Sequence, residues 1–405
     1  MENKVNKKVA FHTLGCKVNI CETEAMIRIF ENSGYDVVDF SDKADIYVIN
    51  TCSVTNIADR KSRQMIHRAK KLAPDAVIIA TGCYVEGLDE EAAKGLDCDQ
   101  LIDNAHKNEI VARAEEIAIT KMGKHTRADV KIEDGCNQFC SYCIIPYRRG
   151  RINIRPEENI LREVRQLAQT GHKEIVLVGI HISSYGRDGL VHLISEIGKI
   201  EGIERIRLGS LEPRLIDDVL LSGLKKVRQF CPHFHLSLQS GCDKTLKAMN
   251  RHYTADEYRQ SVALVRKYWD HPAVTTDVIA GFPGETDEDF EISKAFTDEM
   301  QFFQMHIFPY SRRKGTVADR MPNQLTLAEK QKRVDELEEV NARNTSAFIN
   351  YYAGREIEVL VEESDGEYLI GHTPEYVRVK LPVSEYGEDK INTLIKVTGD
   401  IFILS

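Results

Sequence analysis

Two successive runs of alternating strand-like and helix-like segments constrain this 405-residue chain more than any other feature. In the first run we expect strands at residues 8–13, 45–50, 76–81 and 100–103, and helices at 19–33, 54–72, 89–94 and 107–121. Parallel strands need helical crossovers between them, so this rhythm predicts a parallel sheet covered by helices. Residues 1–122 are therefore expected to form an N-terminal α/β sandwich domain.

A second alternation begins after residues 123–127, which are predicted to be a linker. Its six expected strands, each followed by helical sequence, are 129–133, 174–178, 205–208, 233–238, 273–279 and 302–307. Six such units predict a partial (β/α)6 barrel related to the eight-fold barrel. A long helix at 327–351 would close this central domain, residues 123–351.

The last segment, residues 352–405, changes to short β-branched runs separated by turns. The runs are 357–361, 368–371, 377–381, 393–398 and 401–404. They predict a small antiparallel β-barrel as a third domain, within an α/β fold class overall.

The composition limits where partners can bind. No apolar run approaches the ~18–20 residues of a membrane span, and the N-terminus has no apolar signal core, so a cytoplasmic protein without membrane contact is expected. The net charge is −9, so any nucleic-acid contact must come from local basic patches. Residues 60–71 hold six Lys or Arg and no acid, whereas residues 354–405 hold five basic and eleven acidic residues.

The sharpest chemical signal among the ten cysteines is a C-x3-C-x2-C run formed by Cys136, Cys140 and Cys143. Three thiolates on one tight loop can hold three irons of a 4Fe–4S cluster, and the fourth iron stays open for a substrate or cofactor. A zinc loop is the alternative. Zinc sites usually have four ligands and pair C-x2-C elements, and no partner element lies nearby in this sequence.

A second cysteine set is spread along the first domain. Cys16, Cys52 and Cys83 follow the first three predicted strands by three, two and two residues. Carboxyl ends of parallel strands share one edge of a sheet, so these thiols are expected to converge on a second cluster. The alternative is that each is a small buried hydrophobic residue. We interpret Cys21, Cys98, Cys231 and Cys242 as structural.

The segments that contain these cysteines resemble those of a known family. The segments TLGCKVNICETE, INTCSVTNIA, ATGCY and GCNQFCSYCIIPYRRGR are similar to those of the radical S-adenosylmethionine (SAM) methylthiotransferases. The resemblance implies an N-terminal cluster-binding domain, a radical SAM barrel and a C-terminal TRAM barrel. GCKVN followed by Glu22-Thr23-Glu24 most resembles the branch acting on threonylcarbamoyladenosine in tRNA. The other branches act on isopentenyladenosine in tRNA or on a ribosomal protein.

The resemblance also implies a reaction. SAM would bind at the cluster held by Cys136, Cys140 and Cys143, and its reductive cleavage would give a radical that removes hydrogen from carbon 2 of the modified adenine at tRNA position 37. The cluster held by Cys16, Cys52 and Cys83 would carry the sulfur, and a second SAM would methylate it. The implied partners are the tRNA anticodon stem-loop and an electron donor such as flavodoxin or ferredoxin.

The resemblance points to two further residue sets, of which the first matches the family by position and the second follows from the chemistry of the substrate. The expected SAM-binding residues are Gly179, His181, Ser210, Glu212, Gln239, Asp277, Ile279 and Gly281. A threonylcarbamoyl group ends in a carboxylate, which a guanidinium fork fits, so the expected substrate-binding residues are Arg148, Arg149, Arg214 and Arg312. The remaining alternative function is a non-catalytic iron–sulfur scaffold that binds RNA.

Overall fold

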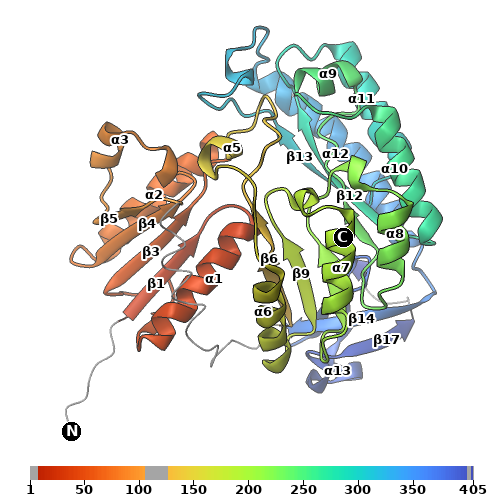
Figure 1. Ribbon diagram of the computed structural model, residues 1–405, viewed down its shortest axis with the longest axis horizontal. Coiled ribbons are helices and arrows are strands. Elements are labelled where there is room, and N and C mark those ends of the chain that lie inside the picture. The colour runs from red at the N-terminus through yellow and green to blue at the C-terminus, as the bar shows by residue number, and fades with distance from the viewer. Residues whose placement is uncertain (1–7, 105–125, 399–402, 405) are drawn as a thin grey trace. The chain divides into compact units, whose positions relative to one another are not determined.

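The structure, a computed structural model, describes residues 8–104, 126–398 and 403–404 (Figure 1). The chain packs as two compact units. The first contains residues 1–123, 134–152 and 311–316, and the second contains residues 124–133, 153–310 and 317–405. The predicted helix 107–121, most of the predicted linker 123–127 and the start of the predicted strand 401–404 lie outside the described residues. The division into three sequential domains stays a prediction.

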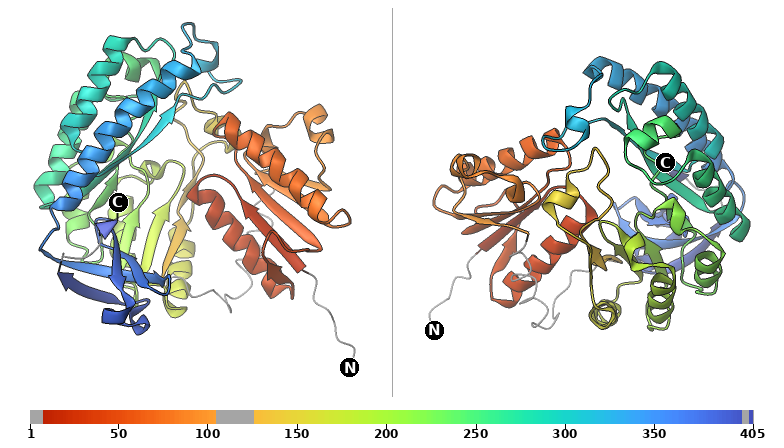
Figure 2. Two further views of the ribbon diagram at one scale, coloured as in Figure 1. Left: turned by 180° about the vertical axis from the view of Figure 1, so that it is seen from behind. Right: turned by 45° about the horizontal axis from the view of Figure 1, so that its top comes forward.

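The first unit is built on a five-stranded parallel sheet with the order β2-β1-β3-β4-β5 (Figures 1 and 2). Its strands are β1 (Lys8–Thr13), β2 (Asp36–Val38), β3 (Ile46–Thr51), β4 (Val77–Gly82) and β5 (Gln100–Ile102). The predicted parallel sheet is confirmed. The sequence did not indicate β2, because a three-residue edge strand is too short to show a period of two.

Helices cover both faces of this sheet. One face is covered by α1 (Lys17–Asn32) and the other by α2 (Asn56–Leu72). The unit also contains α3 (Glu90–Lys94), α5 (Ile145–Arg148) and a 3-10 turn η1 (Val85–Gly87). Successive side chains of a strand point to opposite faces. Val48 of β3 accordingly packs with Met26 of α1, and Ile49 belongs to the cluster that contains Ile66 of α2.

The second unit contains six parallel strands in chain order. They are β6 (Arg127–Lys131), β9 (Glu174–Val178), β10 (Arg205–Leu208), β11 (His233–His235), β12 (Ala273–Ala280) and β13 (Gln304–Pro309). Ladders join them as β6-β9-β10 and β11-β12-β13, and two isolated parallel bridges, Ile206 to Phe230 and Leu211 to Leu236, lie between the two groups. Among the described residues no ladder joins β13 to β6, so the arrangement is open.

The helical elements of this unit follow its strands as predicted. They are α6 (Glu157–Gln169), η2 (Ile182–Tyr185), α7 (Arg187–Ile197), η3 (Pro213–Leu215), α8 (Asp218–Lys225), α9 (Asp243–Ala248), α10 (Ala255–Tyr268), α11 (Asp287–Met300), η4 (Ala318–Arg320) and α12 (Leu327–Asn350). A separate two-stranded sheet pairs β7 (Glu133–Asp134) with β8 (Asn153–Ile154). Within the described ranges, no helix combines the length and apolarity needed to cross a membrane.

The C-terminal segment folds as an antiparallel sheet with the order β17-β14-β15-β16-β18. Its elements are β14 (Glu356–Ser364), β15 (Tyr368–His372), β16 (Arg378–Pro382), α13 (Val383–Tyr386), η5 (Glu388–Lys390), β17 (Leu394–Thr398) and β18 (Ile403–Leu404). Val359, Leu369 and Val379 form its core together with Phe348 of α12.

A buried guanidinium fixes this sheet to the strands of the second unit. Arg207 of β10 donates from Nε to Glu174 (2.8 Å) and from Nη2 to the carbonyl of Thr373 (2.8 Å). A buried ion pair adds little net stability, but removing one partner leaves an uncompensated charge. Arg207 therefore fixes where the C-terminal sheet attaches.

Candidate functional site

Cys16, Cys52 and Cys83 all lie where the first unit's strands end. Cys16 is the N-cap of α1 and follows β1, Cys52 directly follows β3, and Cys83 directly follows β4. Cys52 and Cys83 are buried, and Cys16 is exposed. The predicted placement at one edge of the sheet follows from the parallel pairing of β1, β3 and β4.

Two glycines allow the strand ends to approach one another closely. Gly15 has φ +106°, and a Cβ there would lie 2.8 Å from both Cβ and Sγ of Cys52. Gly82 has φ +97°, and a Cβ there would lie 2.3 Å from the carbonyl oxygen of Thr51. Only glycine fits both the backbone conformation and the space. The residues beside Cys16 and Cys83 thus pack directly on the Cys52 segment.

Cys52 is a buried thiol whose surroundings favour its neutral form. Burial raises the pKa of the Cys52 thiol to about 11, and the nearby Cys83 and Cys16 thiols act in the same direction. A thiolate at this position therefore needs a cation beside it, which bound metal supplies. In the described part of the chain, no group of three or more His, Cys, Asp or Glu side chains forms a site for a single metal ion. A multi-iron cluster instead spreads its ligands over several metals.

The loop with Cys136, Cys140 and Cys143 belongs to the same compact unit. The backbone N–H of Cys143 donates to the carbonyl of Cys140 (2.9 Å), and the N–H of Gln138 donates to Sγ of Cys136 (3.4 Å). Phe139, at φ +49°, turns the chain between the first two cysteines. An N–H directed at a cysteine sulfur is the kind of hydrogen bond that tunes a thiolate ligand of an iron–sulfur cluster, so the loop fits the predicted role.

Arg149, just beyond this loop, connects it to the segment that carries Cys16. Its side chain is 1% exposed, and Nη1 lies 3.1 Å from both Glu22 Oε1 and Asp134 Oδ1. Its Nη2 donates to Asn19 Oδ1 (2.6 Å), and Asn19 in turn donates to the carbonyl of Leu14 (2.6 Å). Burial acts to lower the pKa of Arg149, but the carboxylates of Glu22 and Asp134 raise it above its ordinary value. Arg149 thus holds the two cysteine-bearing segments together.

The eight expected SAM-binding residues lie in or after strands of the second unit. Gly179 and His181 follow β9, Ser210 and Glu212 follow β10, Gln239 follows β11, Asp277 and Ile279 lie in β12, and Gly281 follows β12. Glu133, which the sequence reasoning missed, supports the first pair. Its Oε2 accepts the N–H of His181 (2.7 Å), and a Cβ at Gly179 would lie 2.8 Å from that oxygen.

Backbone contacts bring several of these residues together. The N–H of Glu212 donates to Ser183 Oγ (2.8 Å), which joins the segments after β9 and β10. Gln239, at φ +69°, donates from its N–H to the carbonyl of Asp277 (2.8 Å) and accepts from the N–H of Ile279 (2.9 Å). Asp277 Oδ2 also lies 3.3 Å from His235 Nε2. The segments after β9 and β10 are therefore joined to each other, and the end of β11 is joined to β12.

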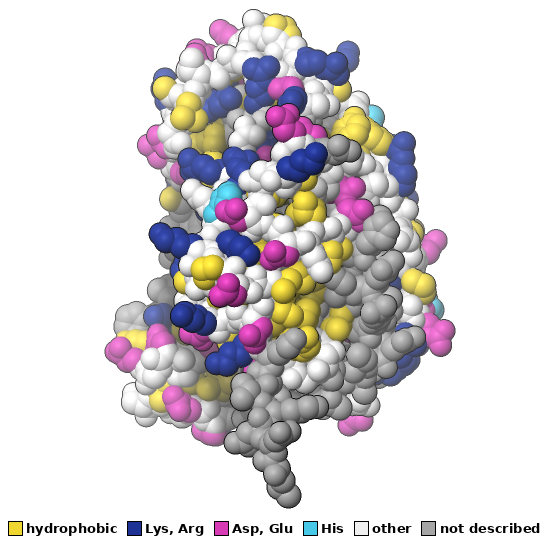
Figure 3. Space-filling view, turned by 90° about the vertical axis from the view of Figure 1, so that its left-hand side faces the viewer, with side chains coloured by type: hydrophobic (Ala, Val, Ile, Leu, Met, Phe, Trp, Pro, Cys, Tyr) yellow, Lys and Arg dark blue, Asp and Glu magenta, His cyan; other side chains and the backbone are white. Residues whose placement is uncertain are grey.

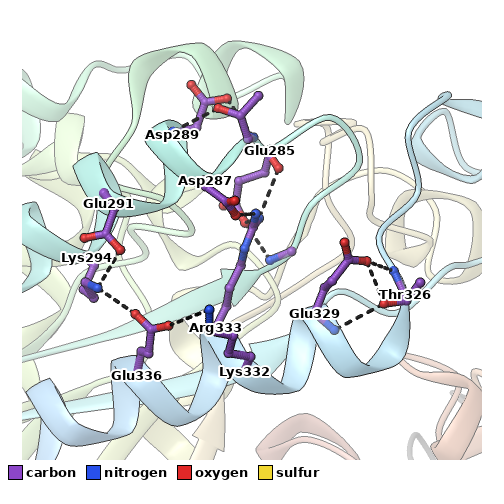
Figure 4. Close-up of polar contacts among 12 residues, drawn as sticks. Glu285, Asp287, Asp289, Glu291, Lys294, Thr326, Glu329, Lys332, Arg333 and Glu336 are labelled. Atoms are coloured by element: carbon purple, nitrogen blue, oxygen red, sulfur yellow. Dashed lines mark hydrogen bonds and ion pairs between the residues drawn. The ribbon is translucent and has the colours of Figure 1, made fainter.

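The glycine-rich turn after β12 is held by α12 (Figure 4). Glu285, buried at the end of this turn, accepts the N–H of Gly281 (2.8 Å) and an N–H of Arg333 (2.5 Å). Burial raises the pKa of Glu285, and the Gly281 N–H and the Arg333 guanidinium oppose that rise. Arg333 was not singled out from the sequence, because it lies 48 residues from Glu285 in a helix that reads as ordinary amphipathic sequence.

Replacing Arg333 with methionine should lower the free energy of unfolding by about 3–5 kcal/mol, because it leaves the Glu285 carboxylate buried without its counter-charge. Removing the guanidinium raises the pKa of Glu285 further. An acid with a raised folded-state pKa destabilises the fold as pH rises above its unfolded pKa, so the loss should be larger at pH 8 than at pH 5. The urea midpoint measures both effects.

The neighbouring Lys332→Met replacement is the matched control, since that side chain is 81% exposed. Adding Glu285→Gln to Arg333→Met should recover part of the loss, because the amide carries no charge and still accepts from Gly281. A midpoint for Arg333→Met equal to that of Lys332→Met would show that the contact does not support this turn.

The other three arginines expected at the substrate lie in different settings. Arg148 is half-buried, its Nη1 donates to the carbonyl of Glu86 (3.2 Å), and within the described residues it forms no ion pair. Burial lowers the pKa of Arg148, and the positive charge of Arg313 acts in the same direction. Arg312 is exposed in the first unit, and Arg214 lies in the second unit with Nη1 on the carbonyl of His252 (3.2 Å).

Arg313, beside Arg312, was not among the arginines expected at the substrate. It is 6% exposed and donates to Ser53 Oγ (2.8 Å), Asn56 Oδ1 (2.8 Å) and Asp59 Oδ2 (2.9 Å). Ser53 directly follows Cys52, so Arg313 fixes the 311–316 segment next to the Cys52 strand end. The sequence YSRRKGT offered two equivalent arginines, and only packing distinguishes the buried one.

Two family profiles match the chain. Residues 8–103 match a family described as uncharacterized protein family UPF0004, and residues 130–296 match the radical SAM superfamily. The chain is 39% identical to the threonylcarbamoyladenosine tRNA methylthiotransferase MtaB of Bacillus subtilis, over 96% of this chain and 93% of that protein. It is 38% identical to MtaB of Aquifex aeolicus, over 96% and 99%. It is 35% identical to the tRNA-2-methylthio-N(6)-dimethylallyladenosine synthase of Thermoanaerobacter pseudethanolicus, over 89% and 83%.

Among solved structures, the fold is similar to the radical SAM methyltransferase TsrM of Kitasatospora setae. The TM-score is 0.59 at 13% identity, and the match covers 78% of this chain and 77% of that one. This likeness concerns the fold alone. The full-length similarity to the MtaB proteins, together with the two profile matches, shows that the chain belongs to the radical SAM methylthiotransferase family.

Proposed function

We propose that this protein converts N6-threonylcarbamoyladenosine at tRNA position 37 to its 2-methylthio derivative, with two 4Fe–4S clusters and two SAM molecules per product. The observation that supports it most is the presence of two cysteine triads in one compact unit. One triad is the loop with Cys136, Cys140 and Cys143, and the other consists of Cys16, Cys52 and Cys83. The similarity to the MtaB proteins supports the choice of substrate in this proposal.

The chain's own residues hold and orient the reacting groups. Each triad offers three thiols to a cluster, and an open iron on each would take an exchangeable ligand. The residues at the ends of β9, β10, β11 and β12 are proposed to bind SAM. When bound, the clusters and SAM supply the radical, the sulfur and the methyl group. The protein supplies positioning of the target carbon and exclusion of water.

Arg148 is the arginine that we propose for the substrate carboxylate, with Arg312 as a second contact. The Arg148 guanidinium is partly desolvated and forms no ion pair among the described residues, although Asp59 and Glu86 act to raise its pKa. A substrate anion would complete the compensation of its charge. Arg149 is occupied by Glu22 and Asp134.

Replacing Arg148 with methionine should weaken binding of a stem-loop carrying threonylcarbamoyladenosine by about 1.5–3 kcal/mol, the usual contribution of a hydrogen bond to a charged group. Binding of the same stem-loop with unmodified adenosine should not change, because it lacks the carboxylate. Arg187→Met is the control, since that arginine pairs with Asp217. Equal losses for both RNAs would exclude a specific carboxylate contact.

Nucleoside mass analysis of tRNA from cells with and without the gene tests the function itself. We expect the methylthio form of threonylcarbamoyladenosine to disappear without the gene and the unmethylthiolated form to accumulate. Loss of the dimethylallyl (isopentenyl) methylthio derivative instead would identify the substrate of the synthase relatives. If no tRNA nucleoside changes, the proposed function is wrong, and the alternatives that remain are a protein substrate and a non-catalytic scaffold.

A further inference from the structure

Helix α2 carries a basic face that the chemistry described above does not use. Residues 60–71 contain six Lys or Arg and no acid. The buried side of the helix is formed by Ser62, Ile66 and Ala69. Residues spaced three and four apart share one side of a helix, so positions 60, 64, 67, 68 and 71 lie opposite this buried side. The burial pattern agrees, since all five are exposed.

Much of this charge is not neutralised by the protein. Lys70 lies 3.8 Å from Asp99, and the Arg63 guanidinium lies over the ring of Tyr84 in a cation–π contact. The remaining four basic side chains are exposed and form no ion pair with any described residue. We call them the α2 basic face: Arg60, Arg68 and Lys71, and also Lys61, which lies about two helical turns before Arg68 and so on the same side. Figure 3 shows one side of the molecule, on which Lys and Arg side chains are interspersed with acidic side chains.

The α2 basic face begins beside the cysteine triad of the first unit. The helix starts at Asn56, four residues after Cys52, and Ser62 Oγ both donates to the carbonyl of Cys52 (3.0 Å) and accepts its N–H (3.2 Å). Val54 and Ile57, at the start of the helix, are 48% and 58% exposed. Over its 17 residues the helix then extends about 25 Å from this edge.

We propose that the α2 basic face binds the phosphate backbone of the RNA stem next to the modified nucleotide. The proposal rests on the proposed function, which supplies an RNA substrate. Phosphate binding depends on clustered Lys and Arg, and in a chain with a net charge of −9 such clusters are local. The C-terminal sheet has the opposite balance, with five basic and eleven acidic residues in 354–405. Charge complementarity therefore favours α2 over that sheet.

The test is the salt dependence of RNA binding. A variant with Arg60→Gln, Lys61→Gln, Arg68→Gln and Lys71→Gln is compared with the wild type, using a synthetic anticodon stem-loop over a range of salt concentrations. Each lost phosphate contact lowers the slope of log K against log salt by about 0.7–0.9. Loss of all four should therefore reduce the slope by about 3. The iron content and thermal midpoint should match the wild type, because the four side chains are exposed.

The matched control removes the same charge elsewhere, through Lys226→Gln, Arg228→Gln, Lys247→Gln and Lys267→Gln, all exposed in the second unit. A slope that falls in the α2 variant and not in the control supports the proposal. Equal slopes in the α2 variant and the wild type overturn it, even if the tRNA product is made. If RNA binding is kept but reduction by flavodoxin slows, the face binds an acidic protein and the proposal is wrong. A wild type that does not bind RNA overturns both this proposal and the tRNA substrate.

Discussion

The Cys140→Ala variant is expected to lose SAM cleavage completely, with no 5′-deoxyadenosine formed in the presence of dithionite. Cys140 is the central residue of the C-x3-C-x2-C loop, and its carbonyl accepts the N–H of Cys143. Two remaining thiols cannot hold a cluster that needs three. The radical step and every later step should therefore stop together.

Iron analysis shows whether this loss is specific. After anaerobic reconstitution, the wild type should hold about eight irons per chain and the Cys140→Ala variant about four. Cys98→Ser is the matched control, because Cys98 lies outside both triads and its Sγ donates to the carbonyl of Gln100 (2.9 Å), a role that a hydroxyl can fill. Undiminished 5′-deoxyadenosine from Cys140→Ala would remove the loop from the proposed chemistry.

The Cys52→Ala variant should separate the two halves of the reaction. Cys52 belongs to the other triad, so the loop is intact and SAM cleavage should continue. Methylthiolated RNA should fall by at least the ~10–100-fold that even outer-shell changes cost a metal site. The iron content should again drop to about four per chain, this time with 5′-deoxyadenosine formation retained.

Comparing Cys140→Ala with Cys52→Ala tests the assignment of the two clusters more strictly than either variant does alone. Both replace one buried cysteine in the same compact unit with alanine, so a general loss of stability would affect them alike. The proposal requires opposite results for SAM cleavage and the same result for the final product. If Cys52→Ala still makes methylthiolated RNA, the second cluster is wrongly assigned, and the triad has a structural role.

Local sequence was sufficient to place both cysteine sets on the elements of the fold, whereas their role as cluster ligands stays a prediction. The positions of Cys16, Cys52 and Cys83 could be predicted because parallel pairing places the carboxyl ends of strands at one edge, whatever the detailed packing. The close approach of Cys136, Cys140 and Cys143 is fixed by spacing within eight residues. The first prediction depends on the alternating pattern of strands and helices, and the second depends on the spacing of cysteines along the chain. Both can be read from a single sequence.

Contacts between distant segments were decided only by the tertiary structure. Arg148 and Arg149 are adjacent and chemically identical, yet Arg149 is bound by Glu22 and Asp134, whereas Arg148 meets a backbone carbonyl. The same holds for Arg312 and Arg313, and for Arg333, whose partner Glu285 lies in another element. Charge pairing depends on which side chains share a buried space, and packing alone settles that.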